Sequence, residues 1–166
     1  REINVTPTGF GGQQHKLDSI NCDAGLMWVD GNKSKIQLVR GEFNQVHQPL
    51  ENWFNENIGT NQFRFGYDPM HNRILMTHKD KWTLSYCFKV DGWKSWHSYI
   101  PDWYLWDAET FYSFYDKSIY RHSLSNNFCE FYGLKFPHVV EFIIHNEGQT
   151  FIPQSIQYNA KVEIDE

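Results

Sequence analysis

The sequence has little cysteine. Its 166 residues hold three, odd in number and far apart, with no CxxC pair, at Cys22, Cys87 and Cys129. A disulfide scaffold needs a denser and even set of cysteines. We therefore expect reduced, buried thiols in a protein that is assembled in a cytoplasm.

Long apolar runs and clusters of positive charge are also lacking. No apolar run approaches the roughly 18 residues that a membrane-spanning helix needs, and the N-terminus has no charged-then-apolar signal segment. The 15 Lys and Arg residues are scattered singly against 20 Asp and Glu, which gives a formal net charge of −5. Proteins that bind nucleic acid usually carry a basic patch or stripe, so this balance argues against that role.

The common catalytic and metal-binding motifs are absent. The chain has no GxSxG, no phosphate-binding P-loop, no GxGxxG and no HExxH. None of the eight histidines sits beside a cysteine with zinc-ligand spacing. We expect these histidines to be exposed turn residues, and metal ligation across neighbouring strands is the minor alternative. They are His15, His47, His71, His78, His97, His122, His138 and His145. We expect no catalytic residue, no metal and no cofactor.

Aromatic residues are abundant: 7 Trp, 9 Tyr and 13 Phe make up 17% of the chain. Aromatic side chains favour the half-buried surfaces of β-sheets, so this bias supports β structure. Aromatics also gather at protein–protein interfaces and on sugar-binding faces. From composition alone, the aromatic residues could therefore form the core or a contact surface.

One pattern recurs along the chain: an apolar run, a polar turn and a second apolar run. The turns lie at Asp30-Gly31, Asp68-Pro69, Asp91-Gly92 and Asp116-Lys117. Gly tolerates positive φ, Pro presets φ, and an Asp carboxylate accepts hydrogen bonds from nearby backbone N–H groups. The pattern predicts a series of β-hairpins, and the same turn chemistry explains the four aspartates better than a catalytic or cation-binding ring does.

A short helix is expected between the first two hairpins. Pro49, Leu50, Trp53 and Phe54 have helical spacing, Pro suits a first helical turn, and Asn57 and Gly59 provide a stop. The sequence predicts one helix near Pro49–Asn57 that packs Trp53 and Phe54 onto the sheets.

The hairpins recur about every 20–25 residues in the second half of the series, and two such hairpins make a four-stranded blade of a β-propeller. Four hairpins supply about two blades, too few to close a ring. Either the rest of a ring lies outside the chain, or the hairpins form an open sheet or sandwich. All-β is the predicted fold class.

The ends of the chain differ from its middle. Residues 1–24 are expected to be an extended arm or the edge of a missing upstream part, with a loop and one strand both open for residues 17–24. Residues 25–128 form the hairpin region. Alternating apolar residues in 129–166 predict a further antiparallel, sandwich-like strand set. The chain begins with Arg1 rather than Met, which also suggests a longer protein.

The densest aromatic run lies between Trp93 and Trp106, in "GWKSWHSYIPDWYLW". Trp93 and Trp96 are expected in a strand, and Trp103 and Trp106 in an exposed loop. Packing or protein contact is favoured over a stacking platform for sugar rings, which remains the alternative. A weaker alternative is a fragment of a glycoside hydrolase whose carboxylates, Asp102, Asp107 and Glu109, share one loop.

The order of these motifs resembles a phage family. A strand ending in Tyr-Asp, "NRI", "TLSY", a Trp-Ser-aromatic strand, "FYSF", "DxxIYRH" and the C-terminal "VVEFIIHNEGQTFIPQSIQY" follow one another. Over roughly residues 25–160 this order is similar to the tail-hub proteins of short-tailed phages, especially the muzzle proteins of crAss-like phages. The resemblance rests on motif order, carries no catalytic signature, and transfers no functional residue.

The resemblance implies a virion structural protein and no enzyme. It implies a β-propeller-like body with a sandwich appendage in a symmetric ring at the distal end of the tail, where it gates genome exit. Members of the family are much longer, so we expect a C-terminal portion whose N-terminal portion is missing. The expected partners are copies of the chain and other tail proteins, with no membrane and with double-stranded DNA only in passage through a mildly acidic channel. Assembly is expected in the host cytoplasm.

Overall fold

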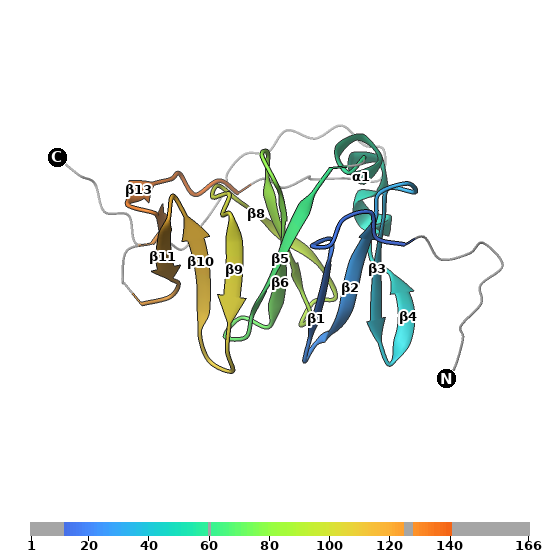
Figure 1. Cartoon of the computed structure of the whole chain (residues 1–166), viewed down its shortest axis with the longest axis horizontal. Coiled ribbons are helices and arrows are strands. Elements are labelled where there is room, and N and C mark those ends of the chain that lie inside the picture. Colours follow the sequence, from blue (N-terminus) through green and yellow to red (C-terminus); the bar gives the residue numbers. More distant parts are fainter. Residues whose placement is uncertain (1–11, 60, 125–127, 141–166) are drawn as a thin grey trace, which may run out of the picture. The chain divides into compact units, whose positions relative to one another are not determined.

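The computed structural model describes residues 12–59, 61–124 and 128–140, and it confirms the predicted all-β class (Figure 1). The chain divides into two compact units, Arg1–Phe136 and Pro137–Glu166. Everything below concerns the first unit. Its strands form antiparallel sheets, three of which have three or four strands, and one short helix follows the first sheet.

Sheet 1 is a meander of four strands in sequence order, β1 (Ser19–Cys22), β2 (Gly25–Asp30), β3 (Lys35–Arg40) and β4 (Glu42–Gln45). The first predicted hairpin is confirmed as β2–β3, and the Asp30 carboxylate accepts the backbone N–H of Lys33 at 3.3 Å in its turn. Strand β1 falls within residues 17–24, where the sequence left a loop and a strand open. It pairs with β2.

The predicted helix is confirmed as a 3-10 turn, Gln48–Leu50, followed by α1, Glu51–Asn57. Phe54 on α1 and Ile58 just beyond it are fully buried. The helix ends where the backbone N–H of Ile58 bonds to the carbonyl of Phe54 and Gly59 takes a positive φ of 52°. A single turn of apolar spacing was therefore enough to locate it.

Sheet 2 is a second four-stranded meander, built from β5 (Phe63–Asp68), β6 (Arg73–His78), β7 (Thr83–Cys87) and β8 (Gly92–His97). Both hairpins predicted here are confirmed, with a β-bulge between Ser85 and Tyr86 in the β7–β8 pair. Asn72 and Asp91 take positive φ in the turns, as Asn and Asp tolerate.

Sheet 3 has three strands, β9 (Trp103–Trp106), β10 (Phe111–Tyr115) and β11 (Ser118–Arg121), with β10 in the middle. The predicted β10–β11 hairpin is confirmed. The expectation of an exposed loop at Trp103 and Trp106 was wrong, because these residues lie in β9, which pairs with β10 along its whole length.

A small hairpin of β12 (Glu130–Phe131) and β13 (Leu134–Lys135) follows. These two strands fall inside the strand set predicted for residues 129–166. The remainder of that prediction, in 141–166, lies outside the described residues, as do residues 1–11 of the predicted arm.

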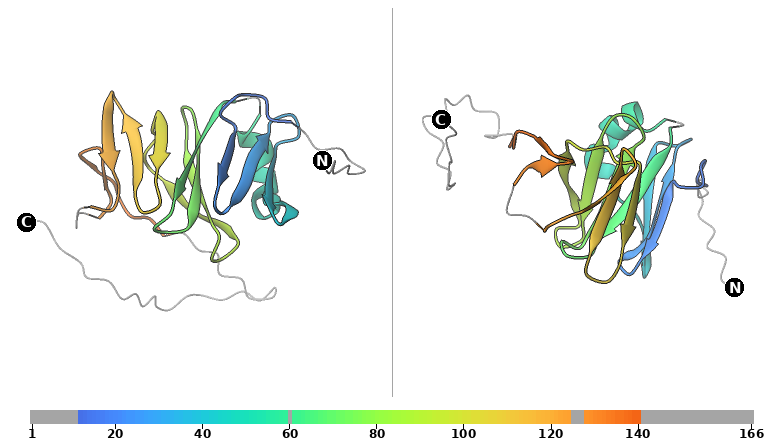
Figure 2. Two further views of the ribbon diagram at one scale, coloured as in Figure 1. Left: turned by 60° about the horizontal axis from the view of Figure 1, so that its bottom comes forward. Right: turned by 60° about the vertical axis from the view of Figure 1, so that its left-hand side comes forward.

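The three larger sheets follow one another with their first strands adjacent: β1 lies beside β5, and β5 lies beside β9. Figure 2 shows the blue, green and yellow-to-orange sheets in that order. The sequence suggested two blades from four hairpins. The described residues instead form three stacked sheets, because β1 and β4 flank the first hairpin and β9 extends the last one.

The main core lies between sheets 1 and 2. Met27, Ile36 and Leu38 on sheet 1 belong to one buried cluster with Ile74, Met76 and Leu84 on sheet 2, and with Phe54 of the helix. A smaller cluster joins sheets 2 and 3 through Leu75, Tyr99, Tyr104 and Phe111. Gly66 on β5 permits this second contact, because a Cβ there would meet Tyr104 Cγ at 2.5 Å.

Candidate functional site

The face of sheet 2 that points toward sheet 3 is polar. Alternation along the paired strands places Asp68, Arg73, Thr77, Thr83, Ser85 and His97 on this face, and the opposite face holds the apolar main core. Polar groups buried between sheets cost free energy unless they are hydrogen-bonded. The hydrogen bonds that these groups make show whether the interface is a functional site or only holds the two sheets together.

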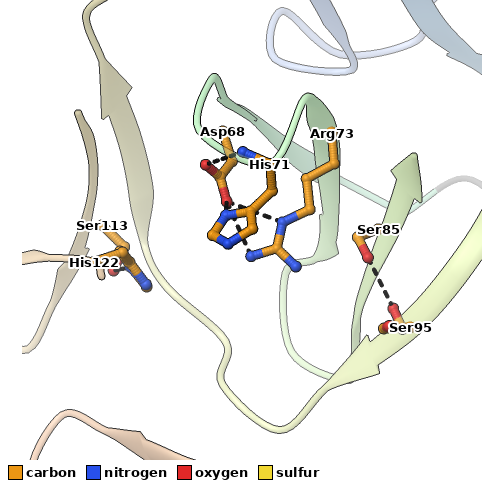
Figure 3. A network of polar contacts seen from close by, with 7 residues as sticks. All are labelled: Asp68, His71, Arg73, Ser85, Ser95, Ser113 and His122. Carbon is orange, nitrogen blue, oxygen red and sulfur yellow. Dashed lines mark hydrogen bonds and ion pairs between the residues drawn. The ribbon is translucent and has the colours of Figure 1, made fainter. Parts of the chain in front are cut away.

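Asp68 is the charged centre of the interface. Its carboxylate is almost fully buried and accepts two hydrogen-bonded contacts from Arg73, each at 2.9 Å (Figure 3). The same carboxylate contacts His71 Nδ1 at 2.7 Å and accepts the His71 backbone N–H at 3.3 Å. Asp68 thus acts as the turn acceptor that the sequence predicted and also neutralises a cation between the sheets.

The same interface also contains a series of hydrogen-bonded hydroxyl groups. Thr77 shares hydrogen bonds with Thr83, at 2.8 Å, and with the Tyr104 hydroxyl, and Thr83 donates to the backbone carbonyl of Tyr99 at 2.7 Å. Burial raises the pKa of Tyr104 above its usual range and raises that of Tyr99 well above it. The Tyr104 phenol therefore stays neutral, and its hydrogen bond with Thr77 joins sheet 3 to sheet 2.

The Ser113 hydroxyl on β10 lies 2.7 Å from His122 Nε2 (Figure 3) and 2.8 Å from the Tyr132 hydroxyl. A Ser–His contact is one element of nucleophilic catalysis. Here Ser113 is fully buried, and Tyr132 stacks on Tyr115 at 4.5 Å in the hairpin that covers the serine. The Ser113–Tyr132 hydrogen bond holds the β12–β13 hairpin on sheet 3.

Two histidines of the interface are held neutral. Burial, aided by the nearby charge of Arg73, lowers the pKa of His97 to about 3, and burial lowers that of His122 to about 4. His47 and His78 are also buried, and His97 lies in strand β8, so the expectation of exposed turn histidines was wrong for these three; it fits His71, which is half exposed in the β5–β6 turn. Among the described residues, no group of three or more His, Cys, Asp or Glu side chains could hold a metal ion.

The three cysteines are free thiols; Cys87 is buried, and Cys22 and Cys129 are partly buried. None of the helices in the described ranges has the length and apolar character that crossing a bilayer requires.

The aromatic run Trp93–Trp106 does not form one platform. Trp93 packs into the main core, where its indole N–H donates to the carbonyl of Val46 at 2.7 Å. Trp96 is half exposed on β8, against Trp53 of the helix. Tyr99 and Tyr104 are buried, and Trp103 and Trp106 lie on opposite faces of β9, where Trp103 is exposed and Trp106 packs against the buried clusters. A stacking surface made from the whole run is therefore wrong.

Strand β9 separates one candidate carboxylate, Asp102, from the other two, Asp107 and Glu109, which share the loop before β10. Asp102 precedes β9 and Asp107 follows it, so about five residues of extended chain, roughly 16 Å, lie between them. Paired glycosidase carboxylates are about 5–9.5 Å apart. Asp107 accepts the backbone N–H groups of Glu109 and Thr110, which lowers its pKa, the opposite of what a general acid needs. The expectation that all three share one loop was wrong, because Asp102 lies at the other end of β9.

A groove of about 300 Å³ runs across the first strands of the three sheets. Ser19 and Asn21 of β1, Arg64 of β5, and Trp103 and Leu105 of β9 line it. Arg64 is held in place by donating to the carbonyls of Phe63 and Asp102. The lining contains this one cation and no carboxylate, so the groove is not acidic.

The most exposed apolar surface of sheet 3 is the face turned away from sheet 2, here called the outer face of sheet 3. Trp103, Leu105 and Ile119 are 44%, 54% and 63% exposed on it, and Tyr112 and Phe114 are partly buried between them. The sequence analysis missed this face. Its signal was present: large apolar residues at both alternate positions of "WYLW" and "FYSFY" are typical of a sheet that packs on both faces.

The comparisons with known proteins give one match. No protein-family model and no solved structure matches the chain. The chain is similar to the muzzle protein of Bacteroides phage crAss001, with 26% identity over 150 residues. The match covers 82% of this chain and 11% of that protein, so the chain spans about a tenth of the length of this curated relative. The match agrees with the family resemblance of the motif order.

Proposed function

We propose that the chain is a structural component of a phage tail, at its distal end, and not an enzyme. The similarity to a phage muzzle protein carries this proposal. The architecture supports it, because a hydrogen bond between Thr77 and Tyr104 joins sheets 2 and 3, and the outer face of sheet 3 exposes large apolar side chains. A stiff stack of sheets with exposed apolar faces is suited to forming the wall of a tail channel together with neighbouring subunits.

The wall is a part of a β-propeller-like body. Successive sheets, here of three or four strands, with their first strands side by side resemble neighbouring blades of a propeller, in which about 4 to 8 blades surround a central channel. We assign residues 25–128 to this body together with β1, which pairs with β2, the preceding residues to an arm, and residues 129–166 to a sandwich-like appendage. The remaining blades come from other copies or from a further portion of the same protein, in a symmetric ring that contacts neighbouring tail proteins.

The groove across β1, β5 and β9 then belongs to the channel wall. Its single cation, Arg64, is engaged by backbone carbonyls, so the wall offers DNA little positive charge. Phosphate contacts by Lys and Arg supply most non-specific DNA binding, and a wall that lacks them lets a duplex pass without adhering. This fits a ring that gates genome exit after assembly in the host cytoplasm.

The test is the presence of the chain in virions. Phage particles purified by density gradient are analysed by quantitative mass spectrometry, and the native particle that carries the chain is weighed. We expect a fixed number of copies per particle and a megadalton assembly. A chain that is absent from purified particles while abundant in the lysate would overturn the proposal.

A second candidate is glycan binding by the groove, favoured by the half-exposed indole of Trp103 beside Arg64 and Asn21. An aromatic ring flanked by polar groups is a common way to hold a sugar. Trp103→Ala should abolish binding on a glycan array, and Trp96→Ala, outside the groove, should not. An array without hits for the wild type removes this candidate.

A further inference from the structure

The outer face of sheet 3 is built from two rows that cross all three strands. Register places Leu105, Tyr112 and Arg121 in one row and Trp103, Phe114 and Ile119 in the other. The opposite face of the same strands is covered: Tyr104, Phe111 and Ser113 are nearly or fully buried against sheet 2 and the β12–β13 hairpin. Five large apolar side chains on one exposed face mark an interaction surface.

The outer face of sheet 1, the one turned away from sheet 2, is also apolar. Leu26 is 40% exposed, and Val39 and Phe43 continue its row across β3 and β4. Trp28, on the same face, contacts Phe43 with 6.0 Å between ring centroids. A depression of about 280 Å³, lined by Leu26, Trp28 and Ser19 with Gly12 and Gln13, opens on this face. It can receive a protruding side chain.

These two surfaces occupy opposite ends of one stack. Sheet 1 packs its inner face on sheet 2, and sheet 2 packs its polar face on sheet 3, always with first strands adjacent. If the same relation continues, the next sheet after sheet 3 must present the face that corresponds to the outer face of sheet 1. Each copy of the chain carries such a face.

We propose that the outer face of sheet 3 in one copy docks on the outer face of sheet 1 in a second copy, head to tail. Two copies supply six stacked sheets, within the range of 4 to 8 blades in known propellers, and three copies would exceed it. The contact is heterologous, and it closes into a ring when the rotation between copies permits. The expected species is a closed dimer with two identical contacts.

This inference rests on the proposed structural role, since it names the partner of that wall, but its test is independent of the virion. The full chain is studied by sedimentation equilibrium over two decades of concentration. We expect a species of about 40 kDa, twice the 19.8 kDa chain. Monomer in this experiment, with the chain present in purified particles, overturns the dimer and leaves the structural role standing.

Two variants probe the two faces, and one serves as a control. Ile119→Glu and Leu26→Glu each place a charge in both contacts of the closed dimer and should raise its dissociation constant at least about 100-fold. Val90→Glu is the matched control, because Val90 is 64% exposed in the β7–β8 turn, much as Ile119 is on β11, but off both faces. Circular dichroism and urea unfolding confirm that each variant folds.

Mixing the variants tests the head-to-tail arrangement. An Ile119→Glu copy and a Leu26→Glu copy can form one unaltered contact, so the mixture should recover dimer that neither variant forms alone. A contact between two sheet 3 faces would instead leave Leu26→Glu fully dimeric. That result overturns the proposal, as would equal weakening by Val90→Glu, a monomer at all concentrations, or open filaments.

Discussion

At the scale of single residues, Gly66 controls how closely sheets 2 and 3 approach. An alanine Cβ there would meet Tyr104 Cγ at 2.5 Å, closer than real contacts allow. Overpacking of this kind costs about 1–3 kcal/mol. We predict that Gly66→Ala lowers the free energy of unfolding by that amount in urea denaturation.

The control for this prediction is Gly92→Ala at the start of β8. A Cβ at Gly92 would have its nearest neighbour at 3.7 Å, an ordinary contact, and the change should stay within about 0.5 kcal/mol. Equal losses in the free energy of unfolding for the two substitutions would show that Tyr104 of sheet 3 does not pack closely against Gly66.

His97 and His122 should make stability depend on pH. Their pKa values are lowered to about 3 and about 4, whereas an unfolded histidine titrates near 6.5. Between these values the unfolded chain binds more protons than the folded one, so stability is full above about pH 6.5 and falls as the pH drops toward 4. The slope is at most about 1.4 kcal/mol per pH unit for each histidine.

This pH dependence is measured by urea unfolding at pH 7, 6 and 5. His122→Gln should flatten the loss of stability, because Gln takes up no proton. His138→Gln, at an exposed position, should leave the slope as it is. A slope that His97→Gln and His122→Gln both leave unchanged would contradict the neutral, buried state of the two rings.

At the scale of elements, α1 contributes to the core through one residue above all. Phe54 is fully buried and lies 5.3 Å from the ring of Trp93 and 5.2 Å from that of Trp53. Replacing a buried Phe by Ala costs about 3–5 kcal/mol. Phe54→Ala should therefore unfold at a much lower urea concentration, whereas Asn55→Ala, on the exposed side of the helix, should change little.

The elements that the sequence predicted are those whose signals are local. Asp30, Asp68 and Asp91 mark turns because the turn chemistry lies within four residues, and the hairpins around them form as expected. The helix was found for the same reason: Pro49, Trp53 and Phe54 fall within two turns.

Strand β9 was missed because its four residues form a strand only through pairing with β10. Pro101-Asp102 before it suggested a loop, and aromatic density suggested a binding platform. Likewise, the hydrogen bond between sheets 2 and 3 joins Thr77 to Tyr104, 27 positions apart, and only the stacking of these sheets brings the two residues together. Such distant contacts leave no pattern in a single sequence.

At the scale of the whole described unit, the two interfaces between sheets differ in kind. Sheets 1 and 2 share a large apolar core, and every residue of β7 is buried. Sheets 2 and 3 share a small core and a polar network, and three of the four residues of β11 are exposed. Sheet 3 therefore has one weakly held face and one open face.

Sheet 3 should consequently open before the rest of the unit unfolds. Segments with few buried apolar contacts open with lower free energy than the core. In native-state hydrogen exchange, the amides of β10 and β11 should exchange with a lower opening free energy than those of β6 and β7. The Ile119→Glu variant is the suitable background, because it removes the association expected to protect sheet 3. Equal opening free energies in both sheets would contradict this prediction. They would mean that the hydrogen bonds between sheets 2 and 3 join them into one cooperative unit, so that sheet 3 is rigid even without a second copy bound to it.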